Sequence, residues 1–268
     1  MTPVFAVTSE QLNAWTVAFL WPFVRILALL STAPLTSDAA VPRQVRLALA
    51  ALLALVLAPS LAPLPDIPIV SVAGAWVVMK QVLAGMAMGF SMRLVFAAVR
   101  AAGEYVSLQM GLSFAAFFDA SSGGQTTVVA RFLNMLALLL FLAVDGHLAM
   151  LSVLARSFET LPISDAPFAA AGWGVLVRGG AGIFASGLML ALPLVTALLT
   201  LNLAMGILNR ASPQFSIFAV GFPLTLLAGT AMMALLVPHL LQMLQPRFDA
   251  AWQAMAAIAR ALGAGATN

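Results

Sequence analysis

About six long apolar segments dominate this sequence, and most of them approach the roughly 20 residues that a helix needs to cross a lipid bilayer. They cover residues 12–35, 45–57, 69–90, 128–154, 181–208 and 215–244. The segments are too long for the strands of a membrane barrel, and none alternates at period two for long. Because the backbone in lipid must satisfy its own hydrogen bonds, helices remain as the solution. The sequence therefore predicts an all-α membrane protein.

The composition leads to the same fold class. The chain is 63% hydrophobic and 8% charged, and its mean hydropathy is +1.06, whereas soluble domains are about half apolar and a quarter charged. A water-soluble fold could not cover so much apolar surface. The net charge of +3 is small and the arginines are scattered along the chain, so we expect no nucleic-acid partner.

Motifs of catalysis and metal binding are missing from the sequence. It contains no P-loop, no H-E-x-x-H and no G-x-S-x-G. The two histidines, His147 and His239, lie far apart and cysteine is absent, so neither a metal site nor thiolate chemistry is predicted. We expect no catalytic residue, no cofactor and no metal.

Proline and glycine divide the apolar segments. We expect a stiff turn at 59–68, a less apolar helical continuation at 91–110, a Gly/Pro-rich loop at 158–180 and a short amphipathic tail at 247–262. Proline removes a backbone donor and bends a helix. The prolines expected to interrupt helical spans are Pro22, Pro193, Pro223 and Pro238.

The central region, 103–131, combines flexible, polar and aromatic residues. Serine, glycine and threonine are mixed there with Phe114, Phe117 and Phe118. Aromatic rings can seal a pore and glycine allows a segment to move, so this composition suits a plug. The alternative is an ordinary interfacial loop whose phenylalanines dip into lipid, and the residues alone leave both interpretations open.

Four ionisable residues lie within apolar segments, where a charge is costly and usually faces a partner or a cavity. They are Arg25, Lys80, Arg93 and Asp145. The sequence Asp145-Gly146-His147 could suggest a proton relay, but residues two apart do not share a helix face. A helix cap or a turn at the break is the favoured interpretation.

Buried amides and small residues suggest where helices meet. Asn202 and Asn209 are seven residues apart on one helix face, and Asn134 lies in another span. Such amides often join membrane helices by hydrogen bonds, so packing is favoured over substrate binding. Gly85 and Gly89 form a G-x-x-x-G, which permits a close approach of two helices.

Several short stretches together resemble one known family. They are Ala33-Pro34, the run from Val41 to Arg46, the run from Ala102 to Ala115 with Asp119, Phe141 to His147, Ser157-Phe158 with Leu161-Pro162, Leu201 to Arg210, Pro213-Gln214 and Ile217 to Thr225. In this order, and over nearly the whole chain, they resemble the FliR family of flagellar export-gate proteins. At position 80 an acidic or neutral polar residue is expected from the resemblance, and Lys80 departs from this pattern.

The resemblance implies a fold and an assembly. A FliP-like part, 1–180, would be followed by a FliQ-like helical hairpin and tail, 181–268, built from kinked hairpins. Members of the family join FliP and FliQ in an export gate of the bacterial inner membrane and flagellar basal body, largely above the bilayer plane. FlhB-like and FlhA-like export proteins and membrane lipid are further implied partners. Unfolded flagellar proteins pass the gate, driven mainly by the proton gradient.

The resemblance also implies roles for individual residues. Within the central loop, about 106–127, the plug residues would be Gly111, Leu112, Ser113, Phe114, Ala115, Phe117 and Phe118. Polar contacts between helices or subunits are expected from Arg25, Arg100, Glu104, Asn134, Asp145, Asn202, Asn209 and Arg210. Two alternatives are an injectisome gate subunit and a secondary transporter, although a transporter needs an inverted repeat and clustered polar residues.

Overall fold

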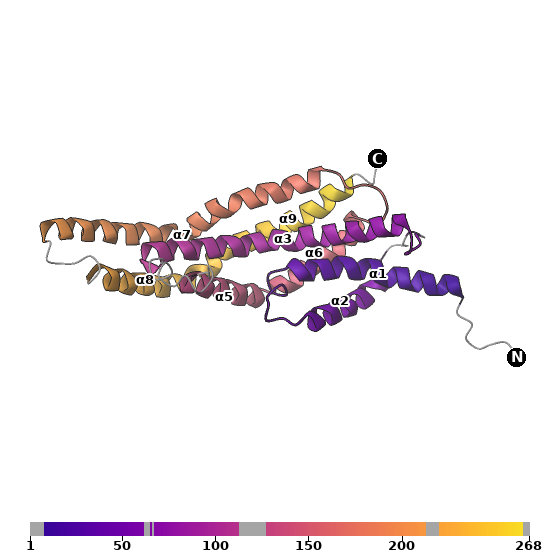
Figure 1. Ribbon diagram of the computed structural model, residues 1–268, viewed down its shortest axis with the longest axis horizontal. Coiled ribbons are helices and arrows are strands. Elements are labelled where there is room, and N and C mark those ends of the chain that lie inside the picture. Colours follow the sequence, from indigo (N-terminus) through magenta and orange to yellow (C-terminus); the bar gives the residue numbers. More distant parts are fainter. Residues whose placement is uncertain (1–7, 62–64, 66, 113–126, 213–219, 265–268) are drawn as a thin grey trace. The chain divides into compact units, whose positions relative to one another are not determined.

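The computed structural model describes residues 8–61, 65, 67–112, 127–212 and 220–264, and every regular element within them is a helix (Figure 1). The elements are α1 (Ser9–Thr32), α2 (Arg43–Leu57), η1 (Ala58–Ser60), α3 (Val72–Gln109), α5 (Val128–Ala143), α6 (Gly146–Thr160), α7 (Ala171–Ala211), α8 (Phe222–Leu236), η4 (Val237–His239) and α9 (Leu240–Gly263). The predicted all-α membrane protein is confirmed.

Among the described residues, five continuous helical stretches are long and apolar enough to cross a membrane. The pair α5 and α6, which is broken at a short gap, would add a sixth. The prediction of about six apolar helical segments is therefore confirmed. Two of the helices, α3 with 38 residues and α7 with 41, are about twice the length that a bilayer crossing requires.

Two boundaries differ from the sequence-based expectation. The predicted loop at 158–180 is wrong at both ends, because α6 continues to Thr160 and α7 begins at Ala171. Glycines near the start of α7 allow close packing and do not break the helix. A Cβ at Gly172 would lie 2.5 Å from the side chain of Leu262. The expected continuation at 91–110 is one helix with the span before it, α3.

The fourth apolar segment is interrupted, and the sixth changes its helix type at a proline. The stretch 128–154 breaks between α5 and α6, where Asp145 adopts the left-handed conformation with φ 54°. Within the stretch 215–244, η4, which contains Pro238, replaces three residues of α-helix by a 3-10 turn, because proline lacks the amide that would continue the α-helical pattern. The helical stretch continues from α8 through η4 into α9. The expected tail at 247–262 is part of α9.

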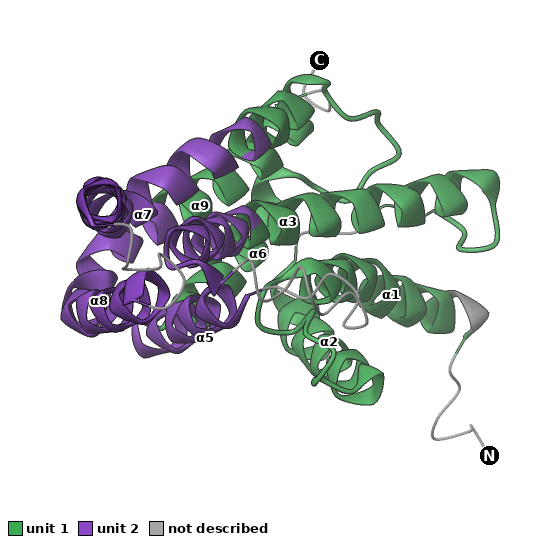
Figure 2. Ribbon diagram, turned by 60° about the vertical axis from the view of Figure 1, so that its left-hand side comes forward, with its two compact units in different colours: residues 1–93, 145–179, 250–268 green, residues 94–144, 180–249 purple. Residues whose placement is uncertain are grey.

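The described structure separates into two compact units (Figure 2). Unit 1 consists of 1–93, 145–179 and 250–268, and unit 2 of 94–144 and 180–249. Contacts define these units, whereas the predicted division into 1–180 and 181–268 rests on resemblance and stays a prediction.

Unit 1 has its core between α1, α3, α6 and the end of α9. Fully buried Trp21, Leu154 and Met255 belong to this core. The G-x-x-x-G of α3 lies against α1, since a Cβ at Gly85 would overlap the carbonyl oxygen of Arg25, and a Cβ at Gly89 would overlap the side chain of Thr32. The predicted close helix approach occurs here.

Unit 2 packs around aromatic and small residues. Phe141 contacts Phe96 and Phe248 edge-on, with ring centroids 5.7 and 5.4 Å away. Small residues bring the helices together, because a Cβ at Gly103 would overlap Ala130 of α5. A Cβ at Gly187 of α7 would lie 2.9 Å from Ala101 of α3. The second half of α3 is thus enclosed by α5 and α7.

Candidate functional site

Arg25 of α1 is the centre of a buried polar junction in unit 1. Its guanidinium is fully buried, and Nε donates to Oε1 of Gln81 on α3 at 2.7 Å. Nη1 donates to the carbonyl oxygen and Oγ of Ser157 at 3.1 and 3.2 Å, and Nη2 donates to the carbonyl oxygen of Leu161 at 2.9 Å. The Phe158 ring centroid lies 4.3 Å from Cζ. We call these five residues the Arg25 junction.

The Arg25 junction satisfies a buried charge with neutral groups. Its carbonyl acceptors belong to the last turn and C-cap of α6, and the carbonyl of Ser157 accepts the Leu161 amide at 2.9 Å as well as the guanidinium. The negative end of the helix dipole also favours a cation there, and an aromatic face adds to the attraction. One side chain therefore joins α1, α3 and the end of α6.

Lys80 extends the same arrangement to the segment after α6. Its Nζ donates to the carbonyl oxygens of Ser164, at 2.9 Å, and of Ala166, and lies 4.9 Å from the ring centroid of Phe168. One turn away, Trp76 Nε1 donates to the carbonyl oxygen of Asp165 at 2.9 Å. Two donors on α3 thus fix the connection between α6 and α7 by its main chain.

The C-terminal end of α3 forms a second polar group, in unit 2. Asn202 Nδ2 of α7 donates to the carbonyl oxygen of Gln109 at 3.1 Å and to its Oε1 at 3.4 Å. Thr225 Oγ1 of α8 lies 3.2 Å from the carbonyl oxygen of Met110. The next residue, Gly111, has φ +79°, a value that glycine adopts without strain. We call these five residues the α3 terminus.

The start of α5 is tied to α3 close to this point. Thr127, the N-cap of α5, accepts a hydrogen bond from Ser107 Oγ at 2.7 Å through its own Oγ1. Its amide donates to Glu104 Oε1 at 3.1 Å. Thr127, the first described residue after 126, is therefore anchored to α3.

The other predicted polar residues have varied surroundings. Arg100 is half-buried on α3, whereas Arg210, in the last turn of α7, is exposed. Asp145 is exposed at the break between α5 and α6. Asn209 is half-buried on α7, and Asn134 of α5 has a buried Oδ1 that lacks a hydrogen-bond partner among the described residues.

Most of the predicted plug lies outside the described residues. Gly111 and Leu112 are described, and both are half-buried. The remaining predicted plug residues, which lie outside the described part of the chain, are Ser113, Phe114, Ala115, Phe117 and Phe118.

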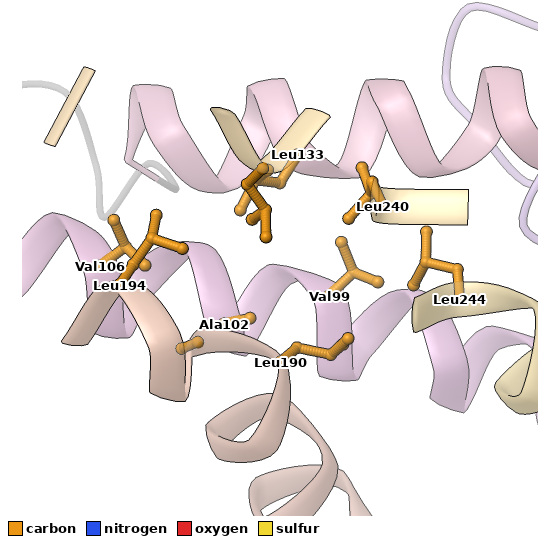
Figure 3. Close-up of a pocket in the computed structure, with 10 residues that line it drawn as sticks. Val99, Ala102, Val106, Leu133, Leu190, Leu194, Leu240 and Leu244 are labelled. Atoms are coloured by element: carbon orange, nitrogen blue, oxygen red, sulfur yellow. The ribbon is translucent and has the colours of Figure 1, made fainter. Parts of the chain in front are cut away.

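A small cavity in unit 2 has apolar walls. Side chains from α3, α5, α7 and α9 converge on it, among them Val99, Leu133, Leu190 and Leu240 (Figure 3). Its volume of about 20 Å³ holds about one water molecule, which would need polar partners to be stable there. We interpret the cavity as a packing gap. Across the described residues, the His, Asp and Glu side chains form no group of three that could hold a metal ion.

Comparison with known proteins identifies the kind of protein to which these polar groups belong. Residues 16–251 match the family described as bacterial export proteins, family 1. The flagellar biosynthetic protein FliR of Pectobacterium carotovorum subsp. carotovorum is 55% identical over 224 residues, which cover 84% of this chain and 85% of that protein. The chain belongs to the FliR family of bacterial export proteins.

More distant members of the FliR family match over a similar length. FliR of Escherichia coli strain K12 is 52% identical over 232 residues, or 87% of this chain and 88% of that protein. FliR of Bacillus subtilis strain 168 is 29% identical over 223 residues, or 81% of this chain and 84% of that protein. Both the Arg25 junction and the α3 terminus lie within the part that matches the family.

Several residues of these two sites were not predicted from the sequence. Gln81 belongs to no motif, and Ser157 lies in a stretch that supports the resemblance to the FliR family but gave no signal for its contact with Arg25. Both roles depend on which helices meet. Thr225 belongs to a stretch that supports the resemblance to the FliR family, yet its side-chain contact gave no sequence signal. The carbonyl acceptors are main-chain atoms, which every residue has, so only the fold reveals them.

Proposed function

We propose that this chain is a structural and gating subunit of a flagellar type III protein-export gate. In this proposal it assembles with FliP and FliQ homologues into a pore for unfolded flagellar proteins, and it has no catalytic role. The observation that carries the proposal is the match to FliR proteins over most of the chain, at 55% identity in the Pectobacterium relative.

Exposed apolar helix faces support an assembled state. On α7 and α8 the outward-facing side chains include Phe184, Leu203, Leu227 and Leu235, which are 72%, 65%, 70% and 74% exposed. Apolar surface of this extent requires a cover of lipid or protein. In the proposed gate, FliP and FliQ homologues cover part of it and membrane lipid covers the rest, while FlhB-like and FlhA-like proteins complete the export apparatus.

The proposed location is the bacterial inner membrane within the flagellar basal body, with the core of the gate raised toward the periplasm. The length of α3 and α7 agrees with helices that extend beyond the hydrocarbon layer, because 38 and 41 residues rise about 57 and 62 Å at 1.5 Å per residue. We further propose that 1–180 is the FliP-like part and 181–268 the FliQ-like hairpin with its tail.

We propose that the segment 111–118 is the plug of the gate. Its phenylalanines are bulky enough to close an opening, and its serine, glycine and alanine residues are small enough to let the segment change conformation. The anchoring of Gln109 and Met110 on one side, and of Thr127 on the other, supports this role. A segment that closes a pore needs fixed ends, because only then does its middle have a defined place to return to.

Copurification tests the assembly. The full chain, tagged at its C-terminus, is expressed with FliP and FliQ homologues of the same genome and purified in mild detergent. We expect a single complex that contains all three proteins at constant ratio across size-exclusion fractions. Recovery of the chain alone, as a stable and monodisperse monomer while both homologues are present in the same membranes, would refute the proposed assembly.

A further inference from the structure

Helix α2 of unit 1 exposes most of its apolar surface. Only 11% of the residues in its apolar stretch, Arg43–Ser60, are buried within the chain, against 61% in the most apolar part of α3. From Leu47 to Pro59 the sequence has no polar side chain. Apolar surface of this extent needs a cover of lipid or protein, and the two sides of α2 favour lipid.

The inner side of α2 has the features of a contact between helices. Ala50 and Ala54 lie one turn apart and are fully buried, where α2 packs against α1 (Figure 2). Membrane helices that meet commonly use such small residues, because these let the two backbones approach closely. The contact of α2 with protein is therefore made through its alanines.

The outer side of α2 carries large aliphatic residues instead. They recur every three or four residues, so they share one helix face, and we call them the outer stripe of α2: Val45, Leu49, Leu52 and Val56, which are 54%, 36%, 59% and 64% exposed. The outer stripe offers neither small residues for a close approach nor polar groups for hydrogen bonds between helices. Lipid chains therefore fit it better than a second helix does.

Two arginines give α2 a charged end. Arg43 is exposed, and Arg46 Nε has no hydrogen-bond partner among the described residues. The first turn contains no acidic residue, and the Asp38 carboxylate nearby accepts the amide of Ala40. The 18-residue stretch rises about 27 Å at 1.5 Å per residue, close to the roughly 30 Å of hydrocarbon in a bilayer. Both the apolar length and the charged end of α2 match a bilayer with its phosphate layer at the arginines.

We propose that the outer stripe of α2 lies against membrane lipid, and that Arg43 and Arg46 bind the phosphates of anionic phospholipids. This inference rests on the proposed membrane location and deepens it, because it assigns lipid, and not a FliP or FliQ homologue, to this face. Arginines beside a bilayer are attracted to anionic headgroups, and their long side chains reach the headgroup layer from a helix end.

Spin labels on single cysteines test the lipid contact, since the native chain has no cysteine. The complete gate, with any cysteine of the FliP and FliQ homologues replaced by serine, is placed in vesicles of phosphatidylcholine and phosphatidylglycerol. The label is attached to Leu52→Cys, in the middle of the outer stripe, or to Gln44→Cys, the matched control at the charged end of the same helix. Oxygen concentrates in the bilayer and a nickel chelate stays in water, so access of each to the label distinguishes the surroundings.

We expect a mobile label at Leu52→Cys that oxygen reaches and the nickel chelate does not, and a label at Gln44→Cys that the nickel chelate reaches. An immobile label at Leu52→Cys, reached by neither reagent, would mean that protein covers the outer stripe. A label there that the nickel chelate reaches would mean that water does. Either result overturns the lipid contact.

A quenching measurement tests the two arginines. A fluorophore on Val45→Cys, between them in the sequence, is quenched by phosphatidylglycerol or phosphatidylcholine with a nitroxide at the same chain position. We expect phosphatidylglycerol to reach half-quenching at a lower lipid fraction, by about fivefold for each arginine. Arg43→Gln combined with Arg46→Gln is expected to abolish this preference, and Arg178→Gln, at an exposed position of α7, to retain it. Equal quenching by the two lipids without these substitutions overturns the headgroup contact.

Copurification of the FliP and FliQ homologues, measured on the same samples, separates this inference from the proposed function. If both homologues copurify while protein covers the label at Leu52→Cys, the assembly stands and the lipid contact is overturned. If neither copurifies, the proposed assembly fails, and the labels on the full chain in vesicles still decide whether α2 contacts lipid.

Discussion

The Arg25 junction and the α3 terminus both contain donors that contact a helix end, but the donor is charged in the first and neutral in the second. In both, polar side chains from other helices contact main-chain carbonyls at the C-terminal end of a helix. The Arg25 junction uses a fully buried cation with four donated hydrogen bonds. The α3 terminus uses a neutral amide and a neutral hydroxyl, from Asn202 and Thr225.

Because of this difference in charge, the free energy needed to separate the helices is expected to be larger at the Arg25 junction than at the α3 terminus. Hydrogen bonds to a charged group contribute about 1.5–3 kcal/mol each, whereas neutral ones contribute about 1 kcal/mol. Separating Arg25 from its acceptors would also leave a buried charge unsolvated. We conclude that loss of the Arg25 junction should cost more stability than loss of the contacts at the α3 terminus.

The largest effect is expected from Arg25→Leu. The substitution removes the donor of Gln81 Oε1 and of the Leu161 carbonyl, and we expect a loss of about 2–6 kcal/mol in the free energy of unfolding, because each buried unsatisfied acceptor costs about 1–3 kcal/mol. The measurement is thermal unfolding of the purified complex, with Arg25→Lys as the comparison that retains charge but not the planar geometry. An unchanged melting temperature in Arg25→Leu would show that the junction does not hold unit 1 together.

A smaller effect is expected where α3 packs on α1 beside the junction. Gly89→Ala places a methyl group against Thr32 and the carbonyl of Leu29, and overpacking of this kind costs about 1–3 kcal/mol. Gly206→Ala on α7 is the matched control, because a Cβ there meets no atom of the described residues within 4 Å. Equal melting temperatures for the two variants would contradict the close approach of α1 and α3.

The smallest effect on stability is expected at the α3 terminus. Thr225→Val should lower the free energy of unfolding by only about 1 kcal/mol, because one neutral hydroxyl is lost. The measurement is thermal unfolding of the complex beside Arg25→Leu in the same scan. A loss as large as that of Arg25→Leu would mean that the α3 terminus stabilises the fold as much as the Arg25 junction does. It would contradict the proposed difference between the two regions.

The sequence predicted the helical fold because apolar length is a strong signal in a membrane chain. It located α1, α2 and α3 closely, and it singled out Asp145-Gly146 as a place where a helix breaks. The predicted loop at 158–180 was wrong at the start of α7, because glycine is common both in loops and where two helices approach closely. Only the position of Leu262 against Gly172 distinguishes the two.

The polar sites were predicted only in part. Arg25 and Asn202 were identified as candidates because a charge or an amide in an apolar span needs a partner. Their partners could not be predicted, because Leu161 and Gln109 contribute main-chain oxygens and lie far away in the sequence. Pairing of this kind depends on which helices meet, and one sequence does not contain that information.

The most direct test of the proposed gate is the solute permeability of cells that express it with 112–117 deleted from this chain. Cells with the complete native gate serve as the reference, and equal amounts of FliP and FliQ homologues in the purified complexes establish equal assembly. The plug proposal predicts that the deletion makes the membrane permeable to a small solute that the native gate excludes. Permeability equal to that of the native gate, in a fully assembled complex, would contradict it.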